Sequence, residues 1–484
     1  MNFNSLHFIA FFLIVFSLYW LLPQRARWVM LLIASYYFYM CWNALHALLI
    51  FGTTALSYAA GRGIGAAKGR AAGRAWLVCT LAVCLGMLAF FKYFNFAADS
   101  VLSLLGLFGL ELSPLSLHIL LPAGISFFTF QTLSYVIDVY RGTVPVERHF
   151  GHYALFVSFF PQLVAGPIER PQNLIPQLKA THDLCAEDLR EGFKLLLSGY
   201  FRKVLAADFF GMFADAVYAA PGSANGPAVA VATVLFAAQI YCDFAGYSEI
   251  AAGCARLLGI RLMKNFDRPY AAAGIRDFWR RWHISLTGWF TDYLYIPLGG
   301  SRRGLARQCL ATLLVFLVSG LWHGAAWTFV VWGCLHGVLM VLSLLLARLK
   351  RALGIPPGGR IRKGLARLGT LLLVCFAWIF FRAESLADAG TLVAGLFTAW
   401  DAGALPETFA ALGMTAADAV QIVLLFVCLW LLPKLSAPAP ARLPLAARID
   451  VPTAAAFFPA AAVIAGWLFI LSLGSSNAFI YFRF

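Results

Sequence analysis

A succession of long apolar segments separated by short loops constrains this chain more than any other feature of its sequence. Hydrophobic residues make up 61% of its 484 residues and charged residues only 12%, whereas soluble domains carry about 25% charged residues. A bilayer requires every backbone polar group to be satisfied within the protein, which favours helices. We therefore predict an all-α, polytopic integral membrane protein with eleven to thirteen membrane-embedded helices. The apolar segments are 6–22, 28–43, 45–60, 75–92, 117–137, 152–166, 192–218, 228–250, 309–322, 325–346, 368–382, 419–433 and 453–473.

The distribution of positive charge predicts how these segments are oriented. The loops at 62–74 and 348–367 contain Lys and Arg but no acidic residue, and such loops face the cytoplasm. The segment 383–418 carries acidic residues and no Lys or Arg, so we expect it outside. Arg25 and Arg27 follow the first apolar segment, which predicts a retained helix with an external N-terminus rather than a signal peptide. Membrane topology thus explains the net charge of +15. We therefore expect membrane lipid as a partner and do not expect nucleic acid.

The chain contains no internal repeat of convincing period, so we predict a single membrane domain over 1–484. Within it we distinguish N-terminal helices at 1–115, a core at 116–345, and C-terminal helices at 346–484 that end in an aromatic motif. The ten cysteines form no C-x-x-C pair, so neither a zinc site nor a disulfide framework is expected.

One histidine, His323, lies in the otherwise apolar segment 317–329. An ionisable side chain at membrane depth is costly and typically faces a cavity or pathway. Imidazole titrates near neutrality, so His323 is a candidate general base. A structural role is the alternative, because Ser319 and Trp327 lie one helical turn before and after it. Buried Asp243 and Glu249 allow a transporter or flippase as a further alternative, although each carboxylate is expected to pair with one of the many arginines.

The segment 256–307 combines many arginines with interleaved aromatic residues and contains a second histidine, His283. Such a composition predicts amphipathic helices that lie at the cytoplasmic interface. Guanidinium groups bind phosphates through paired hydrogen bonds, so this segment is a candidate site for a phosphorylated carrier such as coenzyme A. The candidate donor-binding residues are Arg280, Arg281, Trp282, Arg302 and Arg303. Positive-inside topology with snorkelling side chains is the alternative explanation.

Eight motifs follow one another along this chain. Two are Phe278-Trp-Arg-Arg-Trp-His-Ile-Ser-Leu286 and Gly320-Leu-Trp-His-Gly324, and the others occupy 125–135, 160–168, 243–248, 265–270, 295–300 and 380–385. Taken in order, they resemble the membrane-bound O-acyltransferase superfamily. The resemblance is strongest to its bacterial branch, the membrane subunits of alginate and peptidoglycan O-acetyltransferases.

This resemblance implies a bundle with a tunnel, with the catalytic core at 116–345, and a protein of the bacterial inner membrane. It implies that His323 is the catalytic base and that His283 is a second important residue nearer the cytoplasm. The terminal segment 479–484 is similar to a motif of the teichoic acid D-alanylation system, which implies that Tyr481 relays the acyl group. An interfacial anchor is the other interpretation of Tyr481.

The implied reaction is O-acetylation of a cell-envelope or exported polysaccharide. The donor would be cytoplasmic acetyl-CoA or another thioester, with no permanently bound cofactor and no metal. The acceptor polysaccharide would be reached indirectly through a periplasmic acetyltransferase- or esterase-like partner. D-alanyl transfer of the teichoic-acid type is the alternative within the superfamily.

Overall fold

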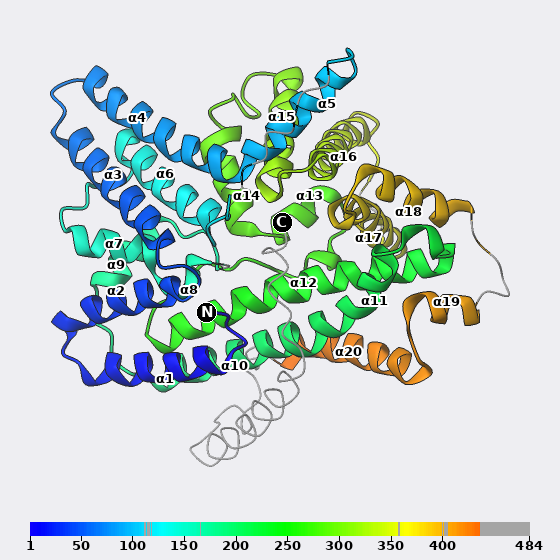
Figure 1. The fold of residues 1–484 in the computed structure, drawn as a ribbon, viewed down its shortest axis with the longest axis horizontal. Coiled ribbons are helices and arrows are strands. Elements are labelled where there is room, and N and C mark those ends of the chain that lie inside the picture. The colour runs from blue at the N-terminus through cyan, green and yellow to red at the C-terminus, as the bar shows by residue number, and fades with distance from the viewer. Residues whose placement is uncertain are drawn as a thin grey trace.

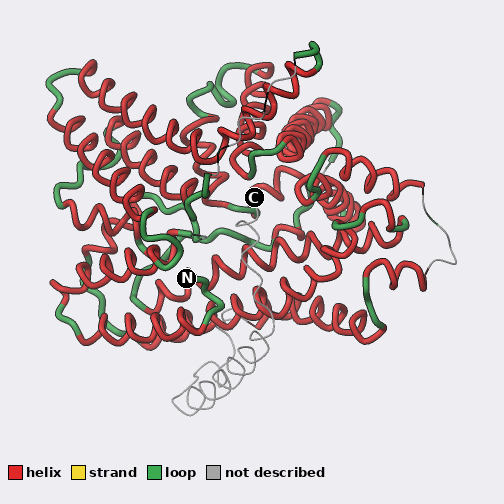
Figure 2. The backbone as a smooth tube through the Cα atoms, viewed as in Figure 1, coloured by secondary structure: helices red, strands yellow, loops and turns green. Residues whose placement is uncertain are grey.

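All regular elements in the described part of the chain are helices, as Figure 2 shows. The structure, a computed structural model, describes residues 1–110, 113, 117, 119–164, 166–356, 359–398, 400 and 405–435. The predicted all-α membrane architecture is confirmed. The predicted segment 453–473 and the aromatic terminus with Tyr481 lie outside the described residues.

The N-terminal third forms two helical hairpins and a long interrupted helix. A π-helical turn, η1, interrupts this helix between α4 and α5. Such π turns accommodate an extra residue and occur frequently at functional sites. The elements are α1 (Leu6–Leu21), α2 (Gln24–Met40), α3 (His46–Ala66), α4 (Arg70–Leu88), η1 (Ala89–Tyr93) and α5 (Phe94–Gly106).

The middle of the chain supplies the long helix α12, which runs beside α10 and α11 (Figure 1). The close approach of α10 to α12 explains why glycines occur where the two helices meet. A Cβ added at Gly246 would lie 2.8 Å from the Gly199 carbonyl oxygen, and one at Gly253 would lie 2.9 Å from that of Gly192. The elements are α6 (Ile125–Arg141), α7 (Phe150–Ser158), α8 (Phe160–Leu163), α9 (Pro171–Lys179), α10 (Ala186–Tyr200), η2 (Phe201–Ala207), α11 (Asp208–Tyr218), η3 (Pro221–Ser223) and α12 (Gly226–Leu257).

The remaining helices begin with short ones and continue with three long ones, α15 to α17, of which α16 and α17 are seen nearly end-on in Figure 1. Helices α15 and α16 form a tight hairpin: a Cβ at Gly320 would lie 2.3 Å from the Phe329 carbonyl oxygen. The elements are η4 (Pro269–Ala271), α13 (Ile275–Arg281), α14 (Ile284–Phe290), η5 (Thr291–Tyr295), α15 (Leu305–His323), α16 (Trp327–Ala352), α17 (Arg360–Arg382), α18 (Leu386–Thr398), α19 (Leu405–Leu412) and α20 (Ala416–Leu435).

Five helices in the described residues are long and apolar enough to cross a bilayer, or six if the bent pair Leu405–Leu412 and Ala416–Leu431 forms one span. The five are Arg70–Gly106, Gly226–Leu257, Leu305–His323, Trp327–Ala352 and Arg360–Arg382. Several other predicted segments form shorter helices or, like 192–218, helices with a π turn. Short helices at membrane depth are tolerated where protein surrounds them.

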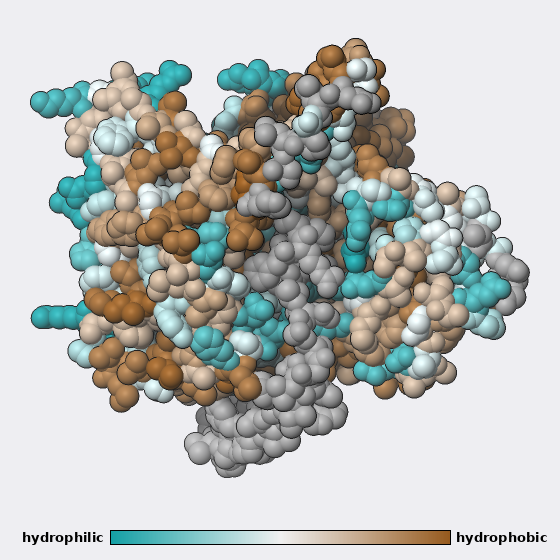
Figure 3. Space-filling model, viewed as in Figure 1, coloured by the Kyte–Doolittle hydropathy of each residue, from teal (hydrophilic) through white to brown (hydrophobic). Residues whose placement is uncertain are grey.

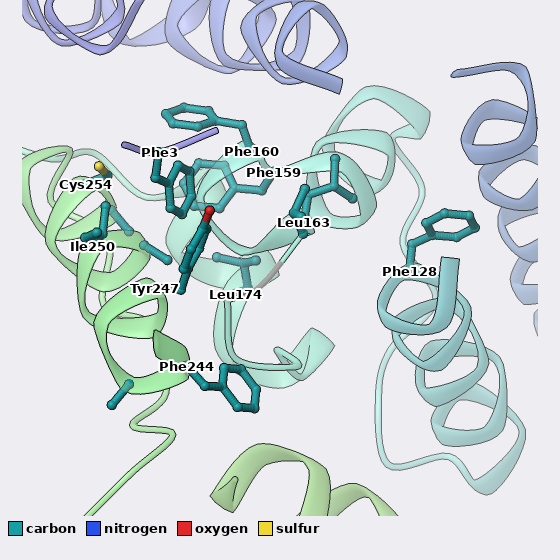
Figure 4. Packing of buried hydrophobic residues seen from close by; sticks show 14 of the residues in the cluster. Phe3, Phe128, Phe159, Phe160, Leu163, Leu174, Phe244, Tyr247, Ile250 and Cys254 are labelled. Carbon is teal, nitrogen blue, oxygen red and sulfur yellow. The ribbon is translucent and has the colours of Figure 1, made fainter. Parts of the chain in front are cut away.

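Apolar side chains cover much of the outer surface as well as the core. The end of α5 exposes Leu104, Leu107 and Phe108, and this region is brown in Figure 3. Such a surface suits contact with lipid rather than water. Inside, Phe3 stacks on Tyr247 with ring centroids 5.4 Å apart, and Figure 4 shows Phe159, between α7 and α8, and Phe160, at the start of α8, beside them.

Candidate active site

His323 ends α15 and is held in place by a sharp turn into α16. Gly324 leaves the helix in an extended conformation. A Cβ at Gly324 would lie only 2.1 Å from the ring of Phe329, so a larger residue there would push the two helices apart. The motif that contains His323 therefore owes its glycines to the geometry of this hairpin.

The imidazole of His323 is 3% exposed and lies among aromatic rings from three helices. Its ring centroid is 5.0 Å from that of Trp322, 5.0 Å from that of Trp332 on α16, and 5.5 Å from that of Phe381 on α17. All three contacts are edge-on. These rings fix the orientation of the imidazole and keep water from most of its surface.

His283 reaches the same place from the turn between α13 and α14. It is fully buried and adopts a left-handed conformation with φ of 44°, which is uncommon for a residue other than glycine and occurs often at functional sites. Its ring centroid is 5.9 Å from that of Trp322. The structure thus brings both histidines predicted from the sequence into contact with the indole of Trp322, although 40 positions separate them.

A hydrogen-bond network orients His283. Its Nδ1 lies 3.0 Å from Oδ1 of Asn265, which also accepts from the Ser285 hydroxyl at 3.0 Å. The Asn265 Nδ2 donates to Ser248 Oγ at 3.1 Å. Because Asn265 Oδ1 is an acceptor, Nδ1 of His283 carries the proton, and Nε2 presents its lone pair. Asn265 lies in one of the sequence motifs, but its role in setting this tautomer was not predicted.

Two further residues that the sequence analysis missed hold the end of α15. Lys92 Nζ donates to the carbonyl oxygens of Trp322 at 2.6 Å and His323 at 3.1 Å, and the Tyr93 hydroxyl donates to that of Leu321 at 2.8 Å. Both donors come from the π turn η1. The last carbonyl oxygens of a helix lack intrahelical partners, and these two side chains donate hydrogen bonds to them. A lysine inside an apolar segment was the available sequence signal.

His323 opens into a cavity of 430 Å³, which we call the histidine cavity. Its walls come from the N-terminus, the turn between α2 and α3, η1, the start of α6 and the end of α15. Its polar lining residues are Asn2, Asn43, His46, Lys92, Ser126 and His323.

A second cavity of 360 Å³, the arginine cavity, is lined by residues of α15 that precede His323. Arg276 and Arg280 line it together with Trp279, Gln308 and Ser319. Ser319 precedes His323 by four residues, which is about one helical turn or 6 Å along the axis. The two cavities therefore reach α15 at positions one turn apart.

The structure separates the five predicted donor-binding residues. Arg280 lines the arginine cavity, whereas Arg281 pairs with Asp277 at 2.9 Å. Trp282 is fully buried and packs on Trp378, with ring centroids 5.1 Å apart. The remaining two, Arg302 and Arg303, are exposed in the loop before α15 and are not among the residues that line either cavity. The sequence analysis did not select Arg276, which lies one turn from Arg280.

Other buried polar residues form ion pairs or hydrogen bonds within the bundle. Lys203 Nζ lies 2.6 Å from Asp243 Oδ1, and Arg202 lies 2.8 Å from Glu249 Oε1. His336 accepts at Nδ1 from the Trp279 indole N–H at 3.3 Å. In the described residues no group of three or more His, Cys, Asp and Glu side chains is arranged to hold a metal ion.

Comparison with known proteins agrees with this geometry. Residues 146–386 match the model of the membrane-bound O-acyltransferase family. The probable alginate O-acetylase of Pseudomonas aeruginosa is 41% identical over 402 residues, which cover 82% of this chain and 75% of the relative. The peptidoglycan O-acetyltransferase of Helicobacter pylori is 34% identical over 428 residues, or 81% of this chain and 79% of the relative.

A more distant relative is the teichoic acid D-alanyltransferase of Bacillus subtilis, which is 26% identical over 272 residues, covering 54% of this chain and 68% of the relative. The two closer matches extend over most of both sequences and come from bacteria. The chain therefore belongs to the membrane-bound O-acyltransferase family, as a multi-pass acyltransferase of the bacterial inner membrane.

Proposed function

We propose that this acyltransferase moves an acetyl group from cytoplasmic acetyl-CoA to an acceptor on the outer side of the membrane, for O-acetylation of a cell-envelope or exported polysaccharide. The observation that carries the proposal is the pair of cavities that reach α15 one turn apart, at Ser319 and at His323. Two such cavities allow donor and acceptor to meet at one residue while entering from different sides.

The distribution of charge supports this assignment of sides. Helix α3 begins at His46, which lines the histidine cavity, and ends beside the basic loop at 62–74. Helix α15 begins after Arg302 and Arg303 and ends at His323. Because acid-free basic loops face the cytoplasm, the arginine cavity is assigned to the cytoplasmic side and the histidine cavity to the outer side.

The arginine cavity has the chemistry of a donor site. Arg276 and Arg280 are exposed at its rim, where their guanidinium groups can bind the phosphates of coenzyme A. Trp279, Phe316 and Val315 provide an apolar passage for the pantetheine arm toward Ser319. Acetyl-CoA acts here as a substrate that is consumed, with no permanently bound cofactor required.

His323 is the proposed base. Its imidazole takes the proton of an acceptor hydroxyl while that oxygen attacks the thioester carbonyl. The C–S bond then breaks, and the departing thiolate of coenzyme A receives the proton from the imidazolium. His283 also contacts the Trp322 indole. Its proposed role is to keep the cytoplasmic side of the site polar through the lone pair on Nε2.

The immediate acceptor is proposed to be either Tyr481, which lies outside the described residues, or a hydroxyl of a periplasmic acetyltransferase- or esterase-like partner. The names of the two closer relatives, an alginate O-acetylase and a peptidoglycan O-acetyltransferase, support a polysaccharide as the final acceptor. D-alanyl transfer remains the second candidate, and the lower identity and coverage of that relative favour acetyl transfer.

The test uses purified full-length protein in liposomes with acetyl-CoA labelled on the acetyl group. We expect wild type to release coenzyme A, His323→Ala to lose at least about 100-fold in rate, and Tyr481→Phe to lose covalent label on the protein. Wild-type turnover by folded His323→Ala would contradict the proposed base. Preference for a D-alanyl thioester over the acetyl donor would replace the proposed substrate.

A further inference from the structure

Lys92 shares the histidine cavity with the proposed base. Its ammonium lies 3.1 Å from the His323 carbonyl oxygen and 5.9 Å from the centroid of the Trp322 ring, and that ring lies edge-on to the His323 imidazole at 5.0 Å. The ammonium and the imidazole thus both contact the Trp322 indole, and Lys92 and His323 line the same cavity.

The bonding of the ammonium leaves capacity for a ligand. An ammonium group has three N–H donors and no acceptor. In the described part of the chain two of them serve the carbonyl oxygens of Trp322 and His323, and the third remains for a group inside the cavity. The two carbonyls also fix the ammonium in position, so it requires no rearrangement when negative charge develops nearby.

The local backbone is built to place this charge. The π turn η1 interrupts an otherwise continuous helix from Arg70 to Gly106. Its last two residues, Lys92 and Tyr93, turn together toward the end of α15. If holding the helix end were the sole requirement, neutral donors such as the Tyr93 hydroxyl would serve without the cost of burying a charge at membrane depth.

We propose that Lys92 is a catalytic residue that stabilises the oxyanion formed during acyl transfer. This inference rests on the proposed function. When the acceptor oxygen bonds to the thioester carbon and its proton moves to His323, the carbonyl oxygen becomes negatively charged, and the free N–H of Lys92 donates to it. The C–S bond then breaks, the carbonyl re-forms, and the thiolate takes the proton from His323, so atoms and charge balance.

The experiment compares Lys92→Met, which keeps the length of the side chain but removes the charge and the donors, with Tyr93→Phe as the matched control from the same turn. Donor turnover is measured with labelled acetyl-CoA in liposomes, together with the thermal unfolding temperature of each variant. We expect Lys92→Met to lower kcat about 100- to 1,000-fold with the donor KM within about twofold. We expect Tyr93→Phe to lower kcat less than about tenfold, and Lys92→Arg to recover part of the rate.

Equal losses in Lys92→Met and Tyr93→Phe would overturn the inference, because both variants remove helix-end donors and only one removes a cation. A rise in KM with unchanged kcat would also overturn it, because the charge would then serve binding. Failure of the proposed function itself is distinguishable: wild type would not turn over acetyl-CoA, or His323→Ala would turn it over normally.

Discussion

At the scale of single residues, the candidate site depends on hydrogen bonds that set the direction of lone pairs. Asn265 Oδ1 accepts from both Ser285 and His283, so it fixes which nitrogen of His283 carries the proton. In sequence these residues are 18 to 20 positions apart. The motif containing Asn265 was recognisable, but its partner within the site was visible only once the chain was folded.

We predict that Asn265→Ala lowers kcat about tenfold or more, because the imidazole of His283 then loses the acceptor that sets its tautomer. Ser248→Ala is the control, since it removes only the partner of the Asn265 amide nitrogen. Steady-state rates with acetyl-CoA, measured on variants with wild-type unfolding temperatures, provide the check. Comparable losses in both variants would mean that Asn265 acts through packing alone.

The sequence selected His323 and His283 for the candidate site together with four arginines, of which only Arg280 lines the arginine cavity. Adjacent residues on a helix point about 100° apart, whereas residues four apart share a face. On α13 this rule puts Arg276 with Arg280 in the arginine cavity, while Arg281 turns to Asp277. Lys92 could not be connected with His323 from sequence, because 231 positions separate them.

At the scale of elements, the tight hairpin of α15 and α16 determines where the proposed base lies. A Cβ at Gly333 would lie 2.4 Å from the Phe316 carbonyl oxygen. That backbone contact has no flexible group that could yield. The predicted apolar segments 309–322 and 325–346 indicated two helices here, but hydropathy carries no information about how closely they approach.

We predict that Gly333→Ala separates the hairpin, lowers the unfolding temperature and reduces acetyl-CoA turnover at least tenfold. Gly369→Ala on α17 is the control, because a Cβ there meets nothing within 4 Å and alanine favours a helix over glycine by about 1 kcal/mol. Unfolding of both variants is followed in the same detergent. An unfolding temperature of Gly333→Ala equal to wild type would show that the helices accommodate the methyl group.

At the scale of the whole molecule, the proposed function gives each side of the membrane its own entrance, through the arginine cavity or the histidine cavity. Apolar segments predicted the membrane class directly, whereas the orientation inferred from the basic loops stays a prediction. Amphipathic helices were predicted in 256–307, where the structure has α13 and α14, but hydropathy did not separate the short helix α8 from a spanning segment. Helices α13 and α14 supply part of the lining of the arginine cavity.

We predict that Arg276→Gln with Arg280→Gln raises the KM for acetyl-CoA about tenfold or more and changes kcat little, because guanidinium–phosphate contacts bind donor and transition state alike. The matched control is Arg302→Gln with Arg303→Gln, which removes the same charge from a loop that does not line the cavity. Donor titrations are made at two salt concentrations. A larger KM increase in the control would return the donor site to the loop before α15.

The aromatic lining of the two cavities also has an electrical consequence. Trp279 and Phe316 line the arginine cavity, and Trp322 lines the histidine cavity. A continuous aqueous pore there would dissipate the membrane potential, which is worth about 2.3 kcal/mol per elementary charge for each 100 mV. In the proposed function an acetyl group crosses one helical turn while its carrier stays on the cytoplasmic side, so outer polymers are modified without a leak of ions.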